Sequence, residues 1–388
     1  MKINNSPSNI LVLSAIRVEP DLPALQLALA EVEDWEQAGR KIIKKGVAGL
    51  FLNLLERHPE LTDNLIPNKL IVQLQQAYLR TVSRSMVLYA TFKDIADALN
   101  ERGIKAIALK GVYLAEHLYP TIGLRQFSDI DLLFRKEDVP AALEVFNTLG
   151  FVLEKPVFDE HVNSVLEPAH LPHMSRRGVS VEVHTRLHGP FQEYNLNERE
   201  LFDRSIPITI NQCPFHVFEI HDLLIHLCVH LDKHINSYQL QFYSLADLVR
   251  ILHTRYTEIN PTLLLERSRS YGADKVVIRT LQLLHELLGA PLHPELSAAL
   301  TEIISRENIE KVAAHLDDLA KKKPSTRTHL KYMNKFDSTS GKLRYVAGVL
   351  FPSKRTLIRS YKIQHQRLYW LWYPYRFWLG IKGLLMKK

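Results

Sequence analysis

A change of hydrophobic periodicity at Gly103 is the feature that most constrains the fold of this chain. From about residue 20 to residue 100 the apolar side chains recur at helical spacing. After Gly103, residues 104–109 form a short apolar run that ends in Lys110-Gly111, as a buried strand does where it enters a turn. The sequence therefore predicts a helical N-terminal region followed by a region that contains a β-sheet.

Strands and helices then alternate along the chain. Residues 112–119 predict a helix. Residues 128–134 (Ser-Asp-Ile-Asp-Leu-Leu-Phe) alternate polar and apolar side chains and then become fully apolar, which indicates a strand with one functional face. Residues 137–150 predict a helix, because Pro140 lies in its first turn and Gly150 at its end. The predicted order is strand, helix, strand, helix.

A hairpin and further helices complete the predicted fold. Residues 169–174 and 179–187 flank Ser-Arg-Arg-Gly, which is typical of a hairpin, and the pattern is helical from about 218 to 320. The predicted fold class is α+β, with a small mixed sheet between two helical regions. The predicted domains are a helical region at 1–85, a sheet-containing core at 86–215, a second helical region at 216–320 and a basic, aromatic tail at 321–388.

Two aspartates on the predicted strand indicate a cation site. Asp129 and Asp131 are separated by one residue, so their side chains leave the same face of the strand about 7 Å apart. At an effective dielectric constant of about 20 their charges repel by roughly 2 to 3 kcal/mol, and a bound cation would relieve this repulsion. Glu182 shares a face with His184 on a second strand, which could bring a third carboxylate to the pair. Such oxygen ligands favour Mg²⁺, with Mn²⁺ as an alternative.

Basic residues near the aspartates are candidates for phosphate binding. Lys110-Gly111 lies at a strand-to-helix junction, where glycine allows close approach and a helix N-terminus offers free N–H groups. Lys110 and Arg125 could neutralise phosphate oxygens. Arg125 lies four residues before Asp129, which favours phosphate contact, and the alternative is an exposed loop arginine. Two metal ions on three carboxylates would hold a triphosphate and lower the pKa of an attacking hydroxyl. An Asp-x-Asp motif alone is more often a solvated strand face, so the ordered set carries the prediction.

That ordered set resembles the nucleotidyltransferase superfamily, and most closely its uncharacterised bacterial branch. The resemblance covers about residues 85 to 255. It is carried by Leu109-Lys-Gly111, Leu118-Tyr119, Arg125, Asp129-Ile-Asp-Leu-Leu133, Leu149-Gly-Phe151, Val181-Glu-Val-His184, Leu227-Cys-Val-His230, His234 and Leu245-Ala-Asp-Leu248.

The resemblance implies a role for each matched site residue. Asp129 and Asp131 would bind the metal ions, Glu182 would be the third carboxylate, and Gly111 would belong to the turn that holds the nucleotide. The core at 86–215 would be a nucleotidyltransferase core. The wider superfamily usually has serine after this glycine to touch a terminal phosphate, whereas this chain has Val112.

The histidines suggest a second metal chemistry. His226, His230 and His234 recur at helical spacing and could bind zinc as in a hydrolase, and His170 and His173 form another pair. The HExxH context is missing, so we expect the row of three to be polar members of a helix beside the core, at the edge of an acceptor pocket. His184 is predicted to support Glu182 or to touch substrate, with sheet packing as the alternative. For Asp247, within a predicted helix, we favour a structural role.

Composition predicts a cytoplasmic location. The two cysteines, Cys213 and Cys228, are too few for a disulfide framework and suit a reducing compartment. The N-terminus is polar where a secretory signal would be apolar, and no stretch approaches eighteen uncharged apolar residues.

The tail differs in charge from the rest of the chain. Residues 321–388 contain seventeen Lys and Arg and one acidic residue, so their net charge is +16. Because the whole chain has a net charge of +7, residues 1–320 carry 7 − 16 = −9. Three of the four tryptophans lie there. The candidate partners are an anionic membrane surface, through aromatic anchoring and cations, and RNA, through phosphate contacts and stacking; alternatively the aromatics cover the helical domain.

The predicted activity follows from these features. We expect a metal-dependent nucleotidyltransferase that moves a nucleoside monophosphate from an NTP to an acceptor and releases pyrophosphate. The acceptor is left open between a small molecule, a protein and an RNA end. The alternative is a non-catalytic nucleotide-binding or membrane-associated adaptor.

Overall fold

The structure is a computed structural model of the chain. It describes residues 6–61, 65–153, 171, 173–187, 194, 196–237, 240–298 and 306–319, and in the C-terminal region residues 339, 342–343, 351, 354, 366–375 and 377–378. The other residues, which include His170 and most of the tail, lie outside the described part.

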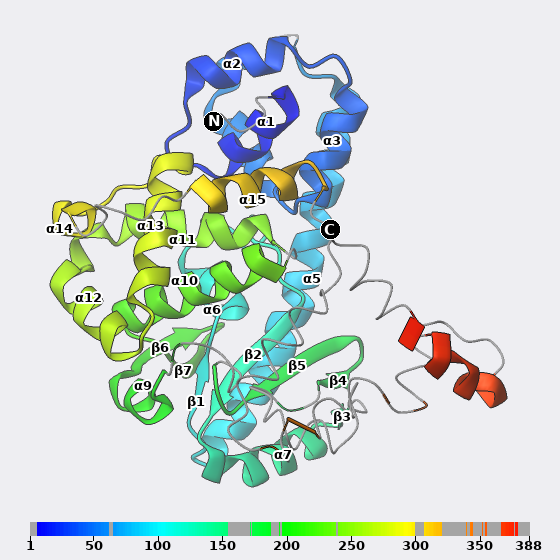
Figure 1. Ribbon diagram of the computed structural model, residues 1–388, viewed down its shortest axis with the longest axis vertical. Coiled ribbons are helices and arrows are strands. Elements are labelled where there is room, and N and C mark those ends of the chain that lie inside the picture. Colours follow the sequence, from blue (N-terminus) through cyan, green and yellow to red (C-terminus); the bar gives the residue numbers. More distant parts are fainter. Residues whose placement is uncertain are drawn as a thin grey trace.

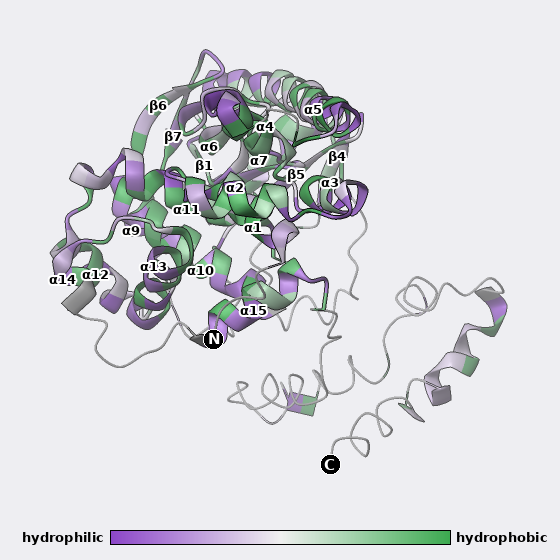
Figure 2. Ribbon diagram, turned by 90° about the horizontal axis from the view of Figure 1, so that it is seen from above, coloured by the Kyte–Doolittle hydropathy of each residue, from purple (hydrophilic) through white to green (hydrophobic). Residues whose placement is uncertain are grey.

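The N-terminal region is helical, as predicted. Its helices are α1 (Pro7–Ile16), α2 (Leu22–Ala30), α3 (Trp35–Lys44), α4 (Ala48–Arg57) and the 34-residue α5 (Asn68–Glu101), with a 3₁₀ turn, η1 (Pro59–Leu61), before α5. Asp21 and Asp34 cap the first turns of α2 and α3, because each carboxylate accepts a backbone N–H three residues on. Helices α1 and α2 are mostly apolar, as Figure 2 shows.

The strands of the described residues form one mixed sheet. They are β1 (Ala106–Ala108), β2 (Asp129–Phe134), β3 (Val152–Leu153), β4 (Met174–Arg176), β5 (Val179–His184), β6 (Ile206–Ile210) and β7 (Cys213–Val217), in the order β3-β4-β5-β2-β1-β7-β6. The pairs β2/β5 and β1/β7 are parallel, and the other pairs are antiparallel. The predicted α+β class with a mixed sheet is therefore confirmed.

Helices cover the sheet and extend beyond it. Helix α5 contacts β2, β5 and β7, and it also contacts α7 (Figure 1). The remaining described helices are α6 (Gly111–His117), η2 (Lys136–Asp138), α7 (Val139–Thr148), α9 (Glu198–Arg204), α10 (Ile220–Ser237), α11 (Phe242–Thr254), η3 (Tyr256–Glu258), α12 (Pro261–Ser270), α13 (Asp274–Leu288), α14 (Pro294–Ala298), α15 (Arg306–Leu316) and η4 (Gln366–Leu371).

Alternation along β2 separates a buried face from a polar one. Ile130, Leu132 and Phe134 are fully buried, and the Phe134 ring meets Phe146 of α7 edge to face. The opposite face carries the two aspartates. The apolar half of β2 thus anchors the strand on α7 while its polar half faces a cavity.

The two helical regions are joined to each other. Asn9 Nδ2 of α1 donates a hydrogen bond to Asp317, and Arg17 donates one to the carbonyl of Leu287. Lys45 pairs with Asp318, next to α15. In Figure 1, α15 accordingly lies beside the N-terminal helices. Within the described residues, no helix combines the length and the apolar character that crossing a bilayer requires.

The predicted elements hold in order but not in every bound. The strand, helix, strand, helix order corresponds to β1, α6, β2 and α7. The predicted hairpin is β4–β5, with a tighter turn than expected: Arg177 and Gly178 both have positive φ, at 48° and 78°, as a two-residue hairpin turn requires. The predicted domain boundaries at 85 and 215 fall inside α5 and β7, and the division into domains stays a prediction.

Candidate active site

The register of β2 against β5 brings the acidic residues of two strands together. In this parallel pair Asp131 lies opposite Glu182, and Asp129 lies opposite Ser180. Since side chains alternate along both strands, the aspartates, Glu182 and His184 share one face of the sheet. The predicted proximity of Glu182 to the aspartates is present in the structure.

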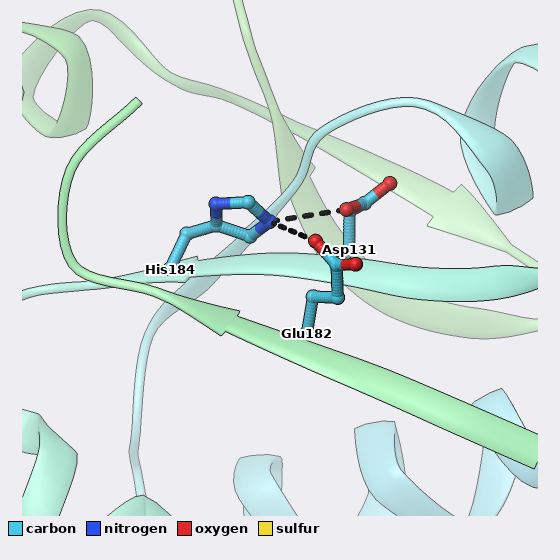
Figure 3. Close-up of side chains that lie close together, drawn as sticks. All are labelled: Asp131, Glu182 and His184. Atoms are coloured by element: carbon cyan, nitrogen blue, oxygen red, sulfur yellow. Dashed lines mark hydrogen bonds and ion pairs between the residues drawn. The ribbon is translucent and has the colours of Figure 1, made fainter. Parts of the chain in front are cut away.

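Asp131, Glu182 and His184 form a tight group (Figure 3). His184 Nε2 lies 3.0 Å from Asp131 Oδ1 and 3.3 Å from Glu182 Oε2. One potential ligand atom from each of the three residues lies within 4.8 Å of the others, a separation that a single metal ion can span. Asp129 was predicted to belong to this set; in the structure it lines the same cavity, and His184 completes the tight group.

The aspartates have opposite pKa shifts. The pKa of Asp129 is raised to about 6, mainly by burial and in addition by the negative charges of Asp131 and Glu182. Burial would also raise the pKa of Asp131, but Lys110 and His184 outweigh burial and hold that pKa well below its usual value. The charge of Asp131 is thus compensated by Lys110 and His184, whereas the charge of Asp129 is opposed by burial and by its acidic neighbours.

Lys110 contacts the cluster of acidic side chains through Asp131. Its Nζ lies 3.2 Å from Asp131 Oδ2 and donates a hydrogen bond to His230 Nε2, at 3.1 Å. Burial lowers the pKa of His230 well below its usual value, and the positive Lys110 lowers it further, so a neutral imidazole accepts this bond. His234 Nε2 lies 3.2 Å from His230 Nε2.

Gly111 is required by close packing at the start of α6. A Cβ at this position would lie 2.8 Å from the ring of Phe127 and 3.3 Å from the carbonyl oxygen of Asp129. The glycine therefore lets α6 begin against the strand that carries the aspartates. Its predicted contact with a nucleotide stays a prediction.

Arg125 is held from α11. Its Nε and Nη2 donate to the two carboxylate oxygens of Asp247, each at 2.8 Å, and Tyr119 donates to the same carboxylate at 2.7 Å. Arg125 is 3% exposed and Asp247 1%. Nη1 of Arg125 is buried and has no hydrogen-bond partner among the described residues. This bidentate ion pair agrees with the structural role expected of Asp247. Of the guanidinium nitrogens of Arg125, Nη1 remains for the predicted phosphate contact.

A cavity of about 250 Å³ joins these groups. We call it the carboxylate cavity; its lining includes Lys110, Gly111, Arg125, Asp129, Asp131, Glu182, His184, His226, His230, Lys233, His234, Tyr243 and Asp247. Every predicted site residue lines it, and so do His226, His230 and His234 of α10. The expectation that this row lies beside the core, at a pocket edge, agrees with this position.

Two contributions from α10 were not predicted from the sequence. They are the contact of His230 with Lys110 and the position of Lys233, which follows His230 by one helical turn and lines the same cavity. The spacing of these two residues could have indicated one polar face on this helix. Of the second histidine pair, His173 Nδ1 lies 3.3 Å from Glu182 Oε1, and His170 lies outside the described residues.

Replacing Asp129 by asparagine is expected to stabilise the metal-free protein at pH 7.5. The folded-state pKa of about 6 lies above the unfolded value of 3.8, so ionised Asp129 opposes folding. The penalty is absent below about pH 4 and complete above about pH 6. After allowance for solvent screening, we expect a gain of about 1 to 2 kcal/mol at pH 7.5.

Urea unfolding with EDTA present, at pH 7.5 and pH 4, measures this gain. Adding Mg²⁺ is expected to stabilise the wild type more than the variant. An equal effect of the substitution at both pH values would contradict the opposed charge of Asp129.

Comparison with known proteins places the chain in a family. A family model described as "Uncharacterised nucleotidyltransferase" matches residues 31–289. No match was found among curated proteins. Two solved structures are similar in part, and at these identities and TM-scores neither bears on the substrate of this chain. They are a crystal structure of ANT(2″)-Ia in complex with adenylyl-2″-tobramycin (12% identity, 52% of this chain, 95% of that chain, TM-score 0.27) and a solution structure of the antibiotic-resistance factor ANT(2″)-Ia (11%, 56%, 96%, 0.28). Because the family match spans more than half of the 388 residues, the chain belongs to this family of nucleotidyltransferases.

Proposed function

We propose that the chain transfers a nucleoside monophosphate from an NTP to an acceptor and releases pyrophosphate in the carboxylate cavity. The observation that carries the proposal is the register of β2 and β5, which sets Asp131 opposite Glu182 with Asp129 on the same face. In this proposal Asp129, Asp131 and Glu182 are the catalytic carboxylates, and Lys110, Gly111 and Arg125 contact the nucleotide.

The donor set fits a divalent cation. The carboxylates supply hard oxygen ligands, which Mg²⁺ and Mn²⁺ prefer. Burial raises the pKa of Asp129, and the nearby charges of Asp131 and Glu182 add to the shift, so a bound cation would favour the ionised carboxylate. When bound, the metal would supply positive charge at the triphosphate and lower the pKa of the acceptor hydroxyl.

The protein's own groups would position the reactants. Lys110 and Arg125 line the same cavity, and both can pair with phosphate oxygens, Arg125 through Nη1, which has no hydrogen-bond partner among the described residues. Lys110 would exchange its present contact with Asp131 for the triphosphate. His184 would orient Asp131 and Glu182 through Nε2.

Isotope transfer tests this activity. The purified protein is incubated with each of the four NTPs, labelled at the α- or the γ-phosphate, together with Mg²⁺ and cell extract. We expect α-label to appear in an acceptor, one pyrophosphate to be released per transfer, no γ-label in the acceptor, and EDTA to stop the reaction. Nucleotide binding without transfer to any extract component would favour the non-catalytic adaptor.

We also propose that the tail binds an anionic membrane surface. The described tail residues Leu368, Trp370, Leu371, Phe377 and Trp378 are each between 47% and 56% exposed. In Figure 1 the segment lies apart from the sheet and its helices. Exposed aromatic side chains can insert at the boundary between the lipid headgroups and the acyl chains, and a net charge of +16 attracts anionic headgroups.

Replacing Trp370 and Trp378 by alanine is expected to weaken membrane binding about tenfold or more, since each ring removes roughly 1 to 2 kcal/mol of interfacial burial. Co-sedimentation with vesicles of phosphatidylcholine and phosphatidylserine measures it, and pure phosphatidylcholine should bind weakly. Leu27→Ala is the control, because Leu27 is 62% exposed on α2. Equal binding by both variants, or preference for RNA over vesicles, would refute the membrane assignment.

A further inference from the structure

A second cavity adjoins the carboxylate cavity. It has a volume of about 390 Å³, and its walls come from the end of α3, the start of α4, the middle of α5 and the loop before β2. Phe127 and Ser128 line both cavities. Because Ser128 directly precedes Asp129, the shared wall lies beside the carboxylates.

Two arginines make this second cavity positive. Arg80 and Arg84, one turn apart on α5, line it, and no acidic side chain is among its lining residues. Arg84 Nη2 donates to the carbonyl oxygen of Ser128 at 2.8 Å. Arg80 is exposed and forms no hydrogen bond or ion pair with the part of the chain that the structure describes. We call this space the arginine cavity.

Two glycines let the loop wall of this cavity pack close to the helices. A Cβ on Gly49 would lie 2.6 Å from the carbonyl oxygen of Gly123, and a Cβ on Gly123 would lie 2.4 Å from the ring of Tyr78. The loop backbone therefore packs directly on α4 and α5, which leaves little freedom for this wall to move.

We propose that the arginine cavity binds the acceptor, and that the acceptor carries an anionic group, a phosphate or a carboxylate, held by Arg80 and Arg84. This inference rests on the transfer reaction proposed above. That reaction needs two substrate sites next to the same carboxylates. The carboxylate cavity is already lined by the cations proposed for the triphosphate, Lys110 and Arg125.

The chemistry constrains how the acceptor lies. Its hydroxyl oxygen must reach past Ser128 to the α-phosphorus and form a new P–O bond there. The bond from the α-phosphorus to the oxygen that bridges to the β-phosphorus breaks, and pyrophosphate leaves with that electron pair. The hydroxyl proton goes to solvent. The anionic group stays behind, in the arginine cavity, where guanidinium groups can bind it in bidentate fashion.

Fractionation of the acceptor tests its charge. Cell extract is passed over an anion-exchange resin, and the retained and unretained fractions are assayed with α-labelled NTP. We expect the acceptor in the retained fraction. Phosphatase treatment separates the two sources: loss of acceptor activity identifies a phosphate, and its survival identifies a carboxylate. An acceptor found in the unretained fraction would overturn the inference and leave the transferase intact, whereas a wild-type protein that labels no fraction would refute both.

Charge reversal at Arg80 tests the place of binding. Arg80→Glu is expected to raise the concentration of retained fraction that gives half-maximal rate by about tenfold, with the KM for NTP unchanged, because it removes a charge-assisted contact. Lys69→Glu is the matched control, since Lys69 is another exposed cation of α5 outside this cavity. If both variants behave alike, the arginine cavity does not bind the acceptor. If Arg80→Glu raises the KM for NTP instead, the cavity holds the triphosphate, and the inference is wrong.

Discussion

Replacing both Asp129 and Asp131 by asparagine is expected to reduce transfer of α-label by at least about a thousandfold. The substitutions keep the size of both side chains but remove two of the three carboxylates proposed to bind the metal, leaving Glu182. Glu182 alone would supply too few anionic oxygen ligands and too little negative charge to hold a divalent ion beside the triphosphate. The rate of label transfer with saturating NTP and Mg²⁺ measures the effect.

The fold of this double variant should survive. Burial and the charges of Asp131 and Glu182 raise the pKa of Asp129, so a neutral asparagine there removes a charge that opposes folding. An asparagine at 131 keeps a side-chain oxygen that can accept from Lys110 or His184. Asp203→Asn serves as the control, because Asp203 is an exposed aspartate of α9 with a 62% exposed side chain. If the double variant has a normal unfolding transition and transfers label at the wild-type rate, Asp129 and Asp131 are not needed for the reaction.

The local part of this site could be predicted from the sequence. Period-two alternation places Asp129 and Asp131 on one face of a strand whatever the strand pairs with. The same rule puts Glu182 and His184 on one face of another strand. These inferences need only the backbone geometry of a single element, and for that reason they hold in the structure.

The pairing of elements could not be predicted in the same way. That β2 and β5 are neighbours and parallel is decided by contacts between residues about fifty positions apart, which no local pattern encodes. The contact of Lys110 with His230 joins residues 120 positions apart, and the bond of Arg125 to Asp247 joins residues 122 apart. Nothing in the sequence therefore indicated a partner for Arg125, although its Nε and Nη2 both donate to Asp247 in the structure.

The hairpin of β6 and β7 was missed for a local reason. Residues 206–210 alternate Ile, Pro, Ile, Thr and Ile, which suits a strand, but Pro207 and Pro214 argue against one. In the structure β6 is the edge of the sheet, where proline is tolerated. Asn211 and Gln212 take positive φ, at 48° and 65°, to close the turn.

Replacing Asp247 by alanine is expected to lower the free energy of unfolding by about 3 to 5 kcal/mol. The substitution leaves the buried guanidinium of Arg125 without its carboxylate and removes the acceptor of the Tyr119 hydroxyl. The ion pair is almost completely buried, so solvent cannot take over these contacts. Urea unfolding followed by circular dichroism measures the loss.

A double substitution separates the packing role of this ion pair from a role in binding. Arg125→Met combined with Asp247→Leu replaces both charges by apolar side chains and should recover most of the stability lost in Asp247→Ala, because no unpaired charge remains buried. If Nη1 of Arg125 contacts the triphosphate, the same double variant should still bind NTP about tenfold more weakly than the wild type. Normal NTP affinity with restored stability would assign Arg125 to the fold alone. A stable Asp247→Ala variant would show that water reaches the guanidinium, against its 3% exposure.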